Sequence, residues 1–217
     1  RMNTDYARLQ MVMQQVRGWN VYDEDVLAML MELPREHFVP AGYEPVAFAD
    51  VAIPLGHGEH MMTPTIEGRL LQALGLRGKE KVLEIGTGSG FMTACLARLA
   101  KHVTSLDVYP DFIEGARRNL EEEGIDNVEL MEMDATRELP AGRFDAIAVT
   151  GSIQTFDPRF VEALDARGRL FIVVGDAPAM EAKLIERTNK HDWTTVALFE
   201  TDLKPLVHGA LPPRFSF

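Results

Sequence analysis

The sequence predicts an α/β fold in which a doubly wound, mostly parallel sheet follows an N-terminal helical extension. From residue 78 onward, short apolar runs alternate with helical segments, which is typical of a parallel sheet covered by helices. Before that point the chain has helical periodicity and then a loop-rich stretch. We expect residues 1–77 to form helices and a functional loop that pack on a main domain, residues 78–217, as one structural unit.

Two helices are expected first. Asn3 to Arg17 carries apolar residues at helical spacing, and Gly18 is expected to end this helix. A second helix begins after Asp23, whose carboxylate can cap it, and stops at Pro34, because proline cannot continue a helix.

Residues 35–63 contain many prolines and glycines and show no clear period. So long an irregular stretch inside a compact domain favours a functional loop. A third helix then opens with Thr63 as its cap and Pro64 at its first position, and Gly75 ends it.

Short runs rich in Val, Ile and Leu predict the buried strands Lys81–Ile85, Val103–Asp107, Val128–Met131, Asp145–Val149 and Arg169–Val174. Helices are expected between them, over Phe91–Ala100, from Pro110 to Gly124, and from Pro158. We expect two further segments to add antiparallel pairing at the sheet edge: Glu181–Arg187, changing from helix to strand, and the strand Thr194–Glu200.

Composition narrows the class of partner. Lys and Arg number 22 against 33 Asp and Glu, a net charge of -11, which argues against nucleic acid because phosphate binding uses clustered basic residues. The single cysteine, Cys95, excludes an intrachain disulfide and a cysteine-rich zinc site, and we expect it to be buried packing.

We expect neither a membrane segment nor a metal site. No apolar run approaches the roughly 20 residues of a membrane span, and the N-terminus shows no signal-peptide pattern, so we expect a cytoplasmic protein. His57 and His60 flank Glu59, but without a helix or a clear third ligand this spacing predicts no metal site.

A glycine-rich turn lies directly between a predicted strand and a predicted helix. Its pattern is G-x-G-x-G rather than the dinucleotide pattern G-x-G-x-x-G, and Glu84 stands two residues before the first glycine. S-adenosylmethionine has no phosphate but has a cationic sulfonium and an amino-acid end, for which a nearby carboxylate is suitable. We therefore predict S-adenosylmethionine as the cofactor.

Two further acids follow the next two strands. Asp107, with Val108, is placed to accept hydrogen bonds from ribose hydroxyls, and Asp134, with Ala135, to lie beside the adenine ring. The full predicted cofactor set is Glu84, Gly86, Thr87, Gly88, Gly90, Asp107, Val108, Asp134 and Ala135.

Several segments in the right order resemble the protein-L-isoaspartate O-methyltransferases: Leu33–Pro40, Ile53–Gly58 with the Pro64 helix, Val82–Gly90, Phe144–Thr150, and the closing strand Leu203–Val207. The resemblance implies a Rossmann-like, seven-stranded class I methyltransferase fold. It also implies carboxyl methylation of isoaspartyl residues in damaged proteins and peptides, without a metal or a covalent intermediate.

The resemblance places His60, Met62 and Thr63 at the catalytic position and Pro64, Thr150 and Gly151 against the substrate. The family loop reads approximately Gly-Gln-Thr-Ile-Ser-x-Pro, so Met62 stands where a serine is expected, and a thioether cannot donate to a carboxylate. Thr150–Gly151–Ser152 also departs from the usual threonine followed by alanines, and Glu59 adds negative charge.

Two alternatives stay open at this point. One is a methyltransferase for a different carboxylate or small molecule; the other is a non-catalytic module that binds the cofactor or senses a protein partner. Asp202 and Lys204 are expected to form a solvated pair, and the tail 211–217 to dock on the domain or a partner. Oligomeric state is not predicted.

Overall fold

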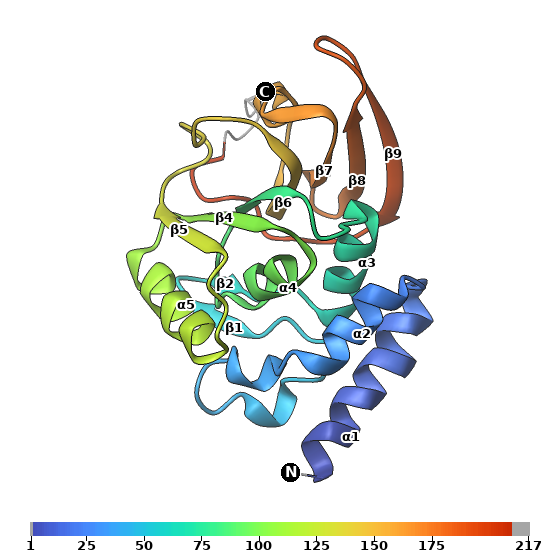
Figure 1. Ribbon diagram of the computed structural model, residues 1–217, viewed down its shortest axis with the longest axis vertical. Coiled ribbons are helices and arrows are strands. Elements are labelled where there is room, and N and C mark those ends of the chain that lie inside the picture. Colours follow the sequence, from blue (N-terminus) through green and yellow to red (C-terminus); the bar gives the residue numbers. More distant parts are fainter. Residues whose placement is uncertain (1, 210–217) are drawn as a thin grey trace, which may run out of the picture.

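The computed structural model describes residues 2–209 (Figure 1), so the tail 211–217 lies outside the described residues. Within them, one seven-stranded sheet has the order β5-β4-β3-β6-β7-β8-β9. The five strands from β5 to β7 are parallel, and β8 and β9 add antiparallel pairs. This confirms the predicted doubly wound, mostly parallel sheet. The strands are β3 (Lys81–Ile85), β4 (His102–Asp107), β5 (Val128–Glu132), β6 (Phe144–Ile153), β7 (Leu164–Asp176), β8 (Ala179–Arg187) and β9 (Trp193–Glu200).

The strand order reverses beside β3. The chain runs outward from β3 to β4 and β5, then returns to place β6 on the other side of β3. Loops therefore leave in opposite directions at the carboxyl ends of β3 and β6, which opens a crevice where ligands bind in folds of this kind.

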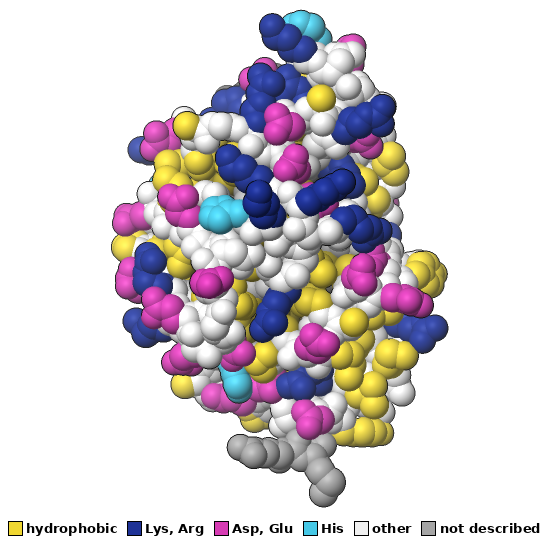
Figure 2. All heavy atoms as spheres, viewed as in Figure 1, with side chains coloured by type: hydrophobic (Ala, Val, Ile, Leu, Met, Phe, Trp, Pro, Cys, Tyr) yellow, Lys and Arg dark blue, Asp and Glu magenta, His cyan; other side chains and the backbone are white. Residues whose placement is uncertain are grey.

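The N-terminal helix runs further than expected. The α-helix α1 (Met2–Gln10) continues as a π-helical turn over Met11–Val16 and a 3-10 turn to Trp19. It ends at Asn20, whose φ is 65°, and not at Gly18. Asparagine is one of the few residues besides glycine that adopt this left-handed conformation readily. The helix packs on the core through Met11, Val12 and Val16, while Tyr6, Leu9 and Met13 are exposed. Figure 2 shows hydrophobic side chains gathered on the surface over the N-terminal helices.

The next two helices begin and end where the sequence predicts, with one change of cap. Helix α2 (Glu24–Glu32) is capped by the carboxylate of Asp23. Helix α3 (Pro64–Leu74) ends at Gly75, but the Thr63 side chain makes no capping hydrogen bond. Asp50 supplies it, accepting from the backbone nitrogen of Thr65 at 3.2 Å. The capping prediction for Thr63 is therefore wrong, because a distant loop provides a carboxylate.

Two core clusters lie on the two faces of the sheet. One contains the π-helical turn Met11–Val16 and residues of α2, α3 and α4 (Phe91–Leu99), with Val82, Ala146 and Phe171 of the sheet. The other contains residues of α6 (Pro158–Glu162), with Leu83 and Ile147 of the sheet. Alternate residues of each strand point to opposite faces, which explains why both neighbours in β3 are buried. The remaining helices are α4 (Phe91–Leu99), α5 (Pro110–Glu122) and α6 (Pro158–Glu162).

Three further predictions concern the single cysteine, the segment Glu181–Arg187 and membrane-spanning helices. Cys95 is buried on α4, as expected. The segment expected to change from helix to strand is strand throughout, since β8 pairs with β7 from Ala179 to Glu186. No helix among residues 2–209 is both long and apolar enough to cross a membrane.

Candidate active site

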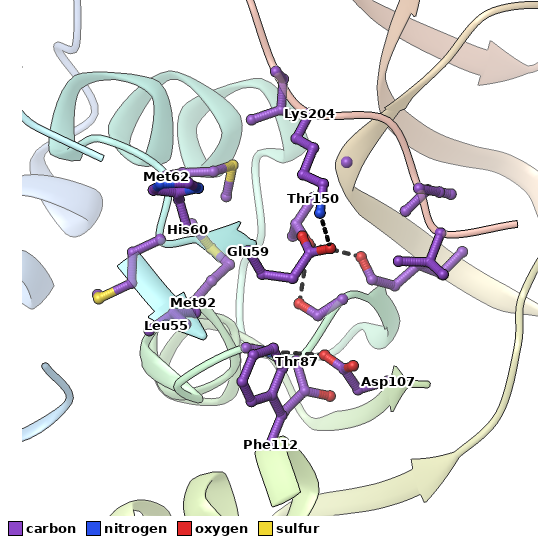
Figure 3. A pocket seen from close by; sticks show the side chains of 18 of the residues that line it. Leu55, Glu59, His60, Met62, Thr87, Met92, Asp107, Phe112, Thr150 and Lys204 are labelled. Atoms are coloured by element: carbon purple, nitrogen blue, oxygen red, sulfur yellow. Dashed lines mark hydrogen bonds and ion pairs between the residues drawn. The ribbon is translucent and has the colours of Figure 1, made fainter. Parts of the chain in front are cut away.

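A cavity of about 440 Å³ opens at the carboxyl ends of β3, β4 and β6, at the reversal of strand order. A small hairpin, β1 (Pro54–Gly56) and β2 (Glu59–His60), borders it on one side, and the segment 202–207 on another (Figure 3). Most predicted site residues line this cavity: His60, Met62, Thr63, Gly86, Thr87, Gly88, Asp107, Val108, Asp134, Ala135, Thr150 and Gly151. Glu84, Gly90 and Pro64 do not.

Gly90 and Pro64 have structural positions. A side chain on Gly90 would begin 3.0 Å from the Cβ of Ala116, so this glycine lets α4 start close against α5. Pro64 is the first residue of α3 and is buried. Neither Gly90 nor Pro64 faces the cavity, and both support residues that line it.

Glu84, predicted to organise the ligand directly, lies beneath the cavity floor and is fully buried. Its Oε1 accepts from the hydroxyls of Thr93 and, at 2.6 Å, Ser105. The Ser105 oxygen lies 2.6 Å from the hydroxyl of Thr87, which does line the cavity. Burial raises the pKa of Glu84 to about 8, against the opposing effect of these hydrogen bonds. Glu84 therefore influences the glycine turn through a chain of hydroxyls.

Asp107 ends β4 with both carboxylate oxygens held. One accepts from the backbone nitrogen of Gly88 at 3.0 Å and the other from that of Tyr109 at 3.1 Å. Burial raises the pKa of Asp107, while the backbone hydrogen bonds oppose that rise. A carboxylate oxygen has more than one acceptor position, so Asp107 can still accept from a ligand hydroxyl in the cavity.

Asp134 follows β5 and is fixed in a similar way. It accepts from the Thr136 hydroxyl at 2.6 Å and pairs with Nδ1 of His208 at 2.8 Å. Burial acts to raise the pKa of Asp134, but the hydrogen bonds from Thr136 and His208 outweigh it, so the pKa is lowered. The sequence prediction did not include the apolar side chains that also line the cavity, among them Leu55, Phe112, Met133 and Leu206. Met133 lies two residues after the predicted strand end at Met131, and this position is the signal that could have found it.

The hairpin is fastened to the start of α5. The ring of His57 stacks on that of Tyr109 with centroids 4.0 Å apart, and its Nε2 lies 3.0 Å from the carboxylate of Asp111. Among the described residues, no group of three or more His, Cys, Asp and Glu is arranged to hold a metal ion. His57 thus has an aromatic partner, Tyr109, directly before α5 and an acidic partner, Asp111, in its first turn.

The loop that carries Met62 is held by a buried ion pair that the sequence reasoning missed. Arg35 is fully buried and pairs with Glu67 of α3. Its Nε donates to the carbonyl of Ala47 at 2.8 Å, and its Nη2 donates to that of Met62 at 3.2 Å. Burial raises the pKa of Glu67 to about 7 although Arg35 lowers it. Arg35 thus fixes the backbone of the loop in which Met62 replaces the expected serine.

Polar groups remain beside Met62, whose side chain is itself buried. The Thr63 hydroxyl, which is not needed as a cap, lies 3.3 Å from that of Thr65 and lines the cavity. His60 is exposed on β2 and lines the cavity as well. Hydroxyl and imidazole groups are therefore available where the thioether cannot donate.

The sequence prediction of a solvated pair between Asp202 and Lys204 is wrong. Lys204 instead pairs with Glu59, with Nζ and Oε1 2.6 Å apart. The predicted closing strand 203–207 is likewise only an isolated parallel bridge between Pro205 and Ser152. Proline lacks the N–H that a longer ladder needs. The segment crosses the rim of the cavity instead of extending the sheet.

Sheet order and cavity together define a Rossmann-like α/β protein of the class I methyltransferase type, with its ligand site at the reversal of strand order. The chain belongs to the protein-L-isoaspartate(D-aspartate) O-methyltransferase family, whose model matches residues 7–209.

Similar proteins cover almost the whole chain. It is 35% identical over 202 residues to a protein-L-isoaspartate O-methyltransferase of Methanoculleus marisnigri, covering 92% of this chain and 91% of that one. It is 34% identical over 207 residues to protein-L-isoaspartate O-methyltransferase 2 of Pelobacter propionicus, with coverages of 94% and 92%. The fold resembles a solved protein-L-isoaspartate O-methyltransferase at 22% identity with a TM-score of 0.79, covering 91% of this chain and 65% of that one.

Proposed function

We propose that this chain transfers the methyl group of S-adenosylmethionine to the free α-carboxylate of L-isoaspartyl residues in proteins and peptides. Membership of the protein-L-isoaspartate(D-aspartate) O-methyltransferase family supports this activity. The structural observation that carries it is a single cavity lined by both the glycine turn with Asp107 and the loop that contains Met62 and Thr63. Donor and acceptor can therefore meet in one enclosed space.

The residues present fit S-adenosylmethionine. Asp107 and Asp134 offer acceptors at consecutive strand ends, and the apolar side chains in the same cavity lining suit a flat adenine ring. The lining includes Asp and Glu side chains, which favour a cationic ligand, and no phosphate-binding turn is needed. When bound, this cofactor supplies a methyl group made electrophilic by a positively charged sulfur.

The protein's own residues mainly hold and enclose. An isoaspartyl carboxylate is ionised at neutral pH, so no side chain has to remove a proton. Holding two reactants in line contributes up to about 7–11 kcal/mol of barrier lowering in well-oriented systems. The hairpin that carries His60 and the loop that carries Thr63 are placed to orient the acceptor and to exclude water.

One observation favours a second candidate, methylation of a different carboxylate or small molecule. Met62 is buried at the position of the expected serine and offers no hydrogen. A non-catalytic cofactor-binding module is the third possibility. The cytoplasmic location, the absence of nucleic acid as a partner and the division near residue 77 stay predictions.

The test is transfer of labelled methyl from S-adenosylmethionine to an isoaspartyl peptide, with the matching aspartyl peptide as control. We expect label only in the isoaspartyl peptide. Cofactor binding without label in either peptide would overturn the proposal in favour of the non-catalytic module. Label in an unrelated carboxylate alone would favour the second candidate.

The Met62→Ser variant then tests whether the missing hydroxyl limits the rate of methyl transfer. Met61→Ser is the matched control, because Met61 is equally buried, borders the same cavity and loses the same volume. We expect a higher kcat/KM for isoaspartyl peptide in Met62→Ser than in Met61→Ser.

A further inference from the structure

Lys204 is the only lysine or arginine among the described residues that line the cavity. The same lining contains the acids Glu59, Glu67, Asp107, Asp134 and Asp202. An anionic acceptor that enters this cavity therefore meets mostly negative side chains, and one cation is available to attract it.

The ammonium group of Lys204 has donors to spare. Its Nζ donates to Oε1 of Glu59 at 2.6 Å, and Figure 3 shows both side chains meeting inside the cavity beside Thr150. An ammonium group has three N–H donors, and Glu59 is the one hydrogen-bond partner that the described structure gives it. A carboxylate can thus bind Lys204 without displacing Glu59.

The backbone of Lys204 is held firmly at the rim. Its carbonyl accepts from the backbone nitrogen of Ser152 at 3.0 Å, and the Ser152 hydroxyl donates to the carbonyl of Leu203 at 2.7 Å. The segment lies this close because residue 151 is glycine: a side chain there would begin 2.6 Å from Cδ2 of Leu206. An anchored backbone lowers the entropy cost of placing the long lysine side chain.

The departures from the family pattern meet at this one lysine. Glu59 pairs with its ammonium group, Ser152 binds its backbone, and Gly151 makes room for its segment. Across the cavity, Met62 has removed the hydroxyl that was expected to hold the acceptor. Glu59 also offsets the charge of Lys204, so that the pair does not repel a cationic methyl donor.

We propose that Lys204 is a substrate-binding residue whose ammonium group receives the carboxylate of the methyl acceptor in place of the missing serine hydroxyl. This inference rests on the proposed function. The competing explanation is that Lys204 only fastens the β1–β2 hairpin through Glu59, and the two explanations differ in what the Glu59 variant does.

The experiment measures KM and kcat for an isoaspartyl peptide, and the affinity for S-adenosyl-L-homocysteine, in four proteins: wild type, Lys204→Met, Lys204→Arg and Glu59→Gln. Lys204→Met is expected to raise KM about tenfold, the equivalent of about 1.4 kcal/mol of lost binding. Lys204→Arg should restore most of it. Glu59→Gln keeps the cation and removes its partner, so KM should stay level or fall. The affinity for S-adenosyl-L-homocysteine should change by less than about twofold, because we do not expect the pair of Lys204 and Glu59 to be a main contact of that ligand.

Equal increases in KM for Lys204→Met and Glu59→Gln would overturn the inference in favour of a hairpin fastening. An unchanged KM in Lys204→Met would also overturn it, while an active wild type would leave the proposed function standing. A wild type that labels no isoaspartyl peptide would overturn the proposed function, and this inference with it.

Discussion

The hydroxyl of Thr150 lies where a side chain on residue 86 would begin: a Cβ on Gly86 would be 2.1 Å from Oγ1 of Thr150. That hydroxyl is within hydrogen-bond distance of the carbonyls of Ile85, at 2.8 Å, and Gly86, at 3.0 Å. The ends of β3 and β6 are thereby joined across the reversal of strand order. Because a hydroxyl has one proton, Thr150 donates it to a carbonyl of the turn, and not to the carboxylate of a methyl-accepting substrate.

Gly86→Ala is expected to weaken binding of S-adenosyl-L-homocysteine by at least about tenfold, because the added methyl collides with Thr150 and disturbs the turn. Gly78→Ala is the matched control. Gly78 has a similar positive φ of 90° with no atom within 4 Å, so it isolates the backbone cost, about 1 kcal/mol of stability. Calorimetric titration measures the affinity, and equal affinities in the two variants would contradict the role given to this contact.

Asp107→Ala should weaken binding of the same ligand by about tenfold or more, since it removes a carboxylate that orders two backbone N–H groups and faces the cavity. Asp126→Ala, at an exposed acid after α5, should leave the affinity unchanged. Retention of wild-type affinity by Asp107→Ala would show that the ribose assignment is wrong.

Arg35→Met should lower the free energy of unfolding by about 3–5 kcal/mol, because Glu67 stays buried without its partner. The double variant Arg35→Met with Glu67→Gln should recover much of that loss. Urea unfolding measures both, with Arg98→Met on the exposed side of α4 as control. A loss in Arg35→Met no larger than in the control would refute the structural role of the pair.

The raised pKa of Glu84 determines how the free energy of unfolding should depend on pH. Its pKa is about 8 in the folded protein and about 4.5 ordinarily, so between these values the folded protein keeps a proton that the unfolded chain has released. Stability must therefore fall as pH rises through this window, by about 1.4 kcal/mol per pH unit for one group. Glu67, with a pKa of about 7, adds a fall in the same direction.

Glu84→Gln removes one titrating group and keeps an oxygen for Thr93 and Ser105. Its unfolding free energy, measured in urea from pH 5.5 to 7.5, should decline less steeply than that of the wild type, by about 1.4 kcal/mol per pH unit. Parallel curves for the two proteins would mean that Glu84 does not hold a proton in this range.

The sequence predicted the local features of this fold well. Lys81–Ile85 is a strand with the predicted bounds, because Val82, Leu83 and Ile85 form a short apolar stretch that is typical of a buried strand in a parallel sheet. Asp23 caps α2 as expected, since a capping bond needs only neighbours in sequence. The cavity residues that directly follow strand ends were predictable for the same reason.

What the sequence did not predict are partnerships between distant residues. Lys204 and Glu59 lie 145 residues apart, and Arg35 and Glu67 lie 32 apart, with no local pattern to connect them. Asp50 took the capping role assigned to Thr63 in the same way. Glu84 was placed against the ligand because its neighbours are there, whereas the pleat of β3 turns its side chain under the floor.

The most direct test of the account is where the methyl group goes. A single isoaspartyl peptide that also carries an ordinary aspartyl residue and a glutamyl residue would be incubated with the protein and S-adenosylmethionine, and the methyl ester located by fragmentation mass spectrometry. The account predicts an ester on the isoaspartyl α-carboxylate and none on the other two side chains. An ester on the ordinary aspartyl or glutamyl side chain, or none at all despite cofactor binding, would contradict it.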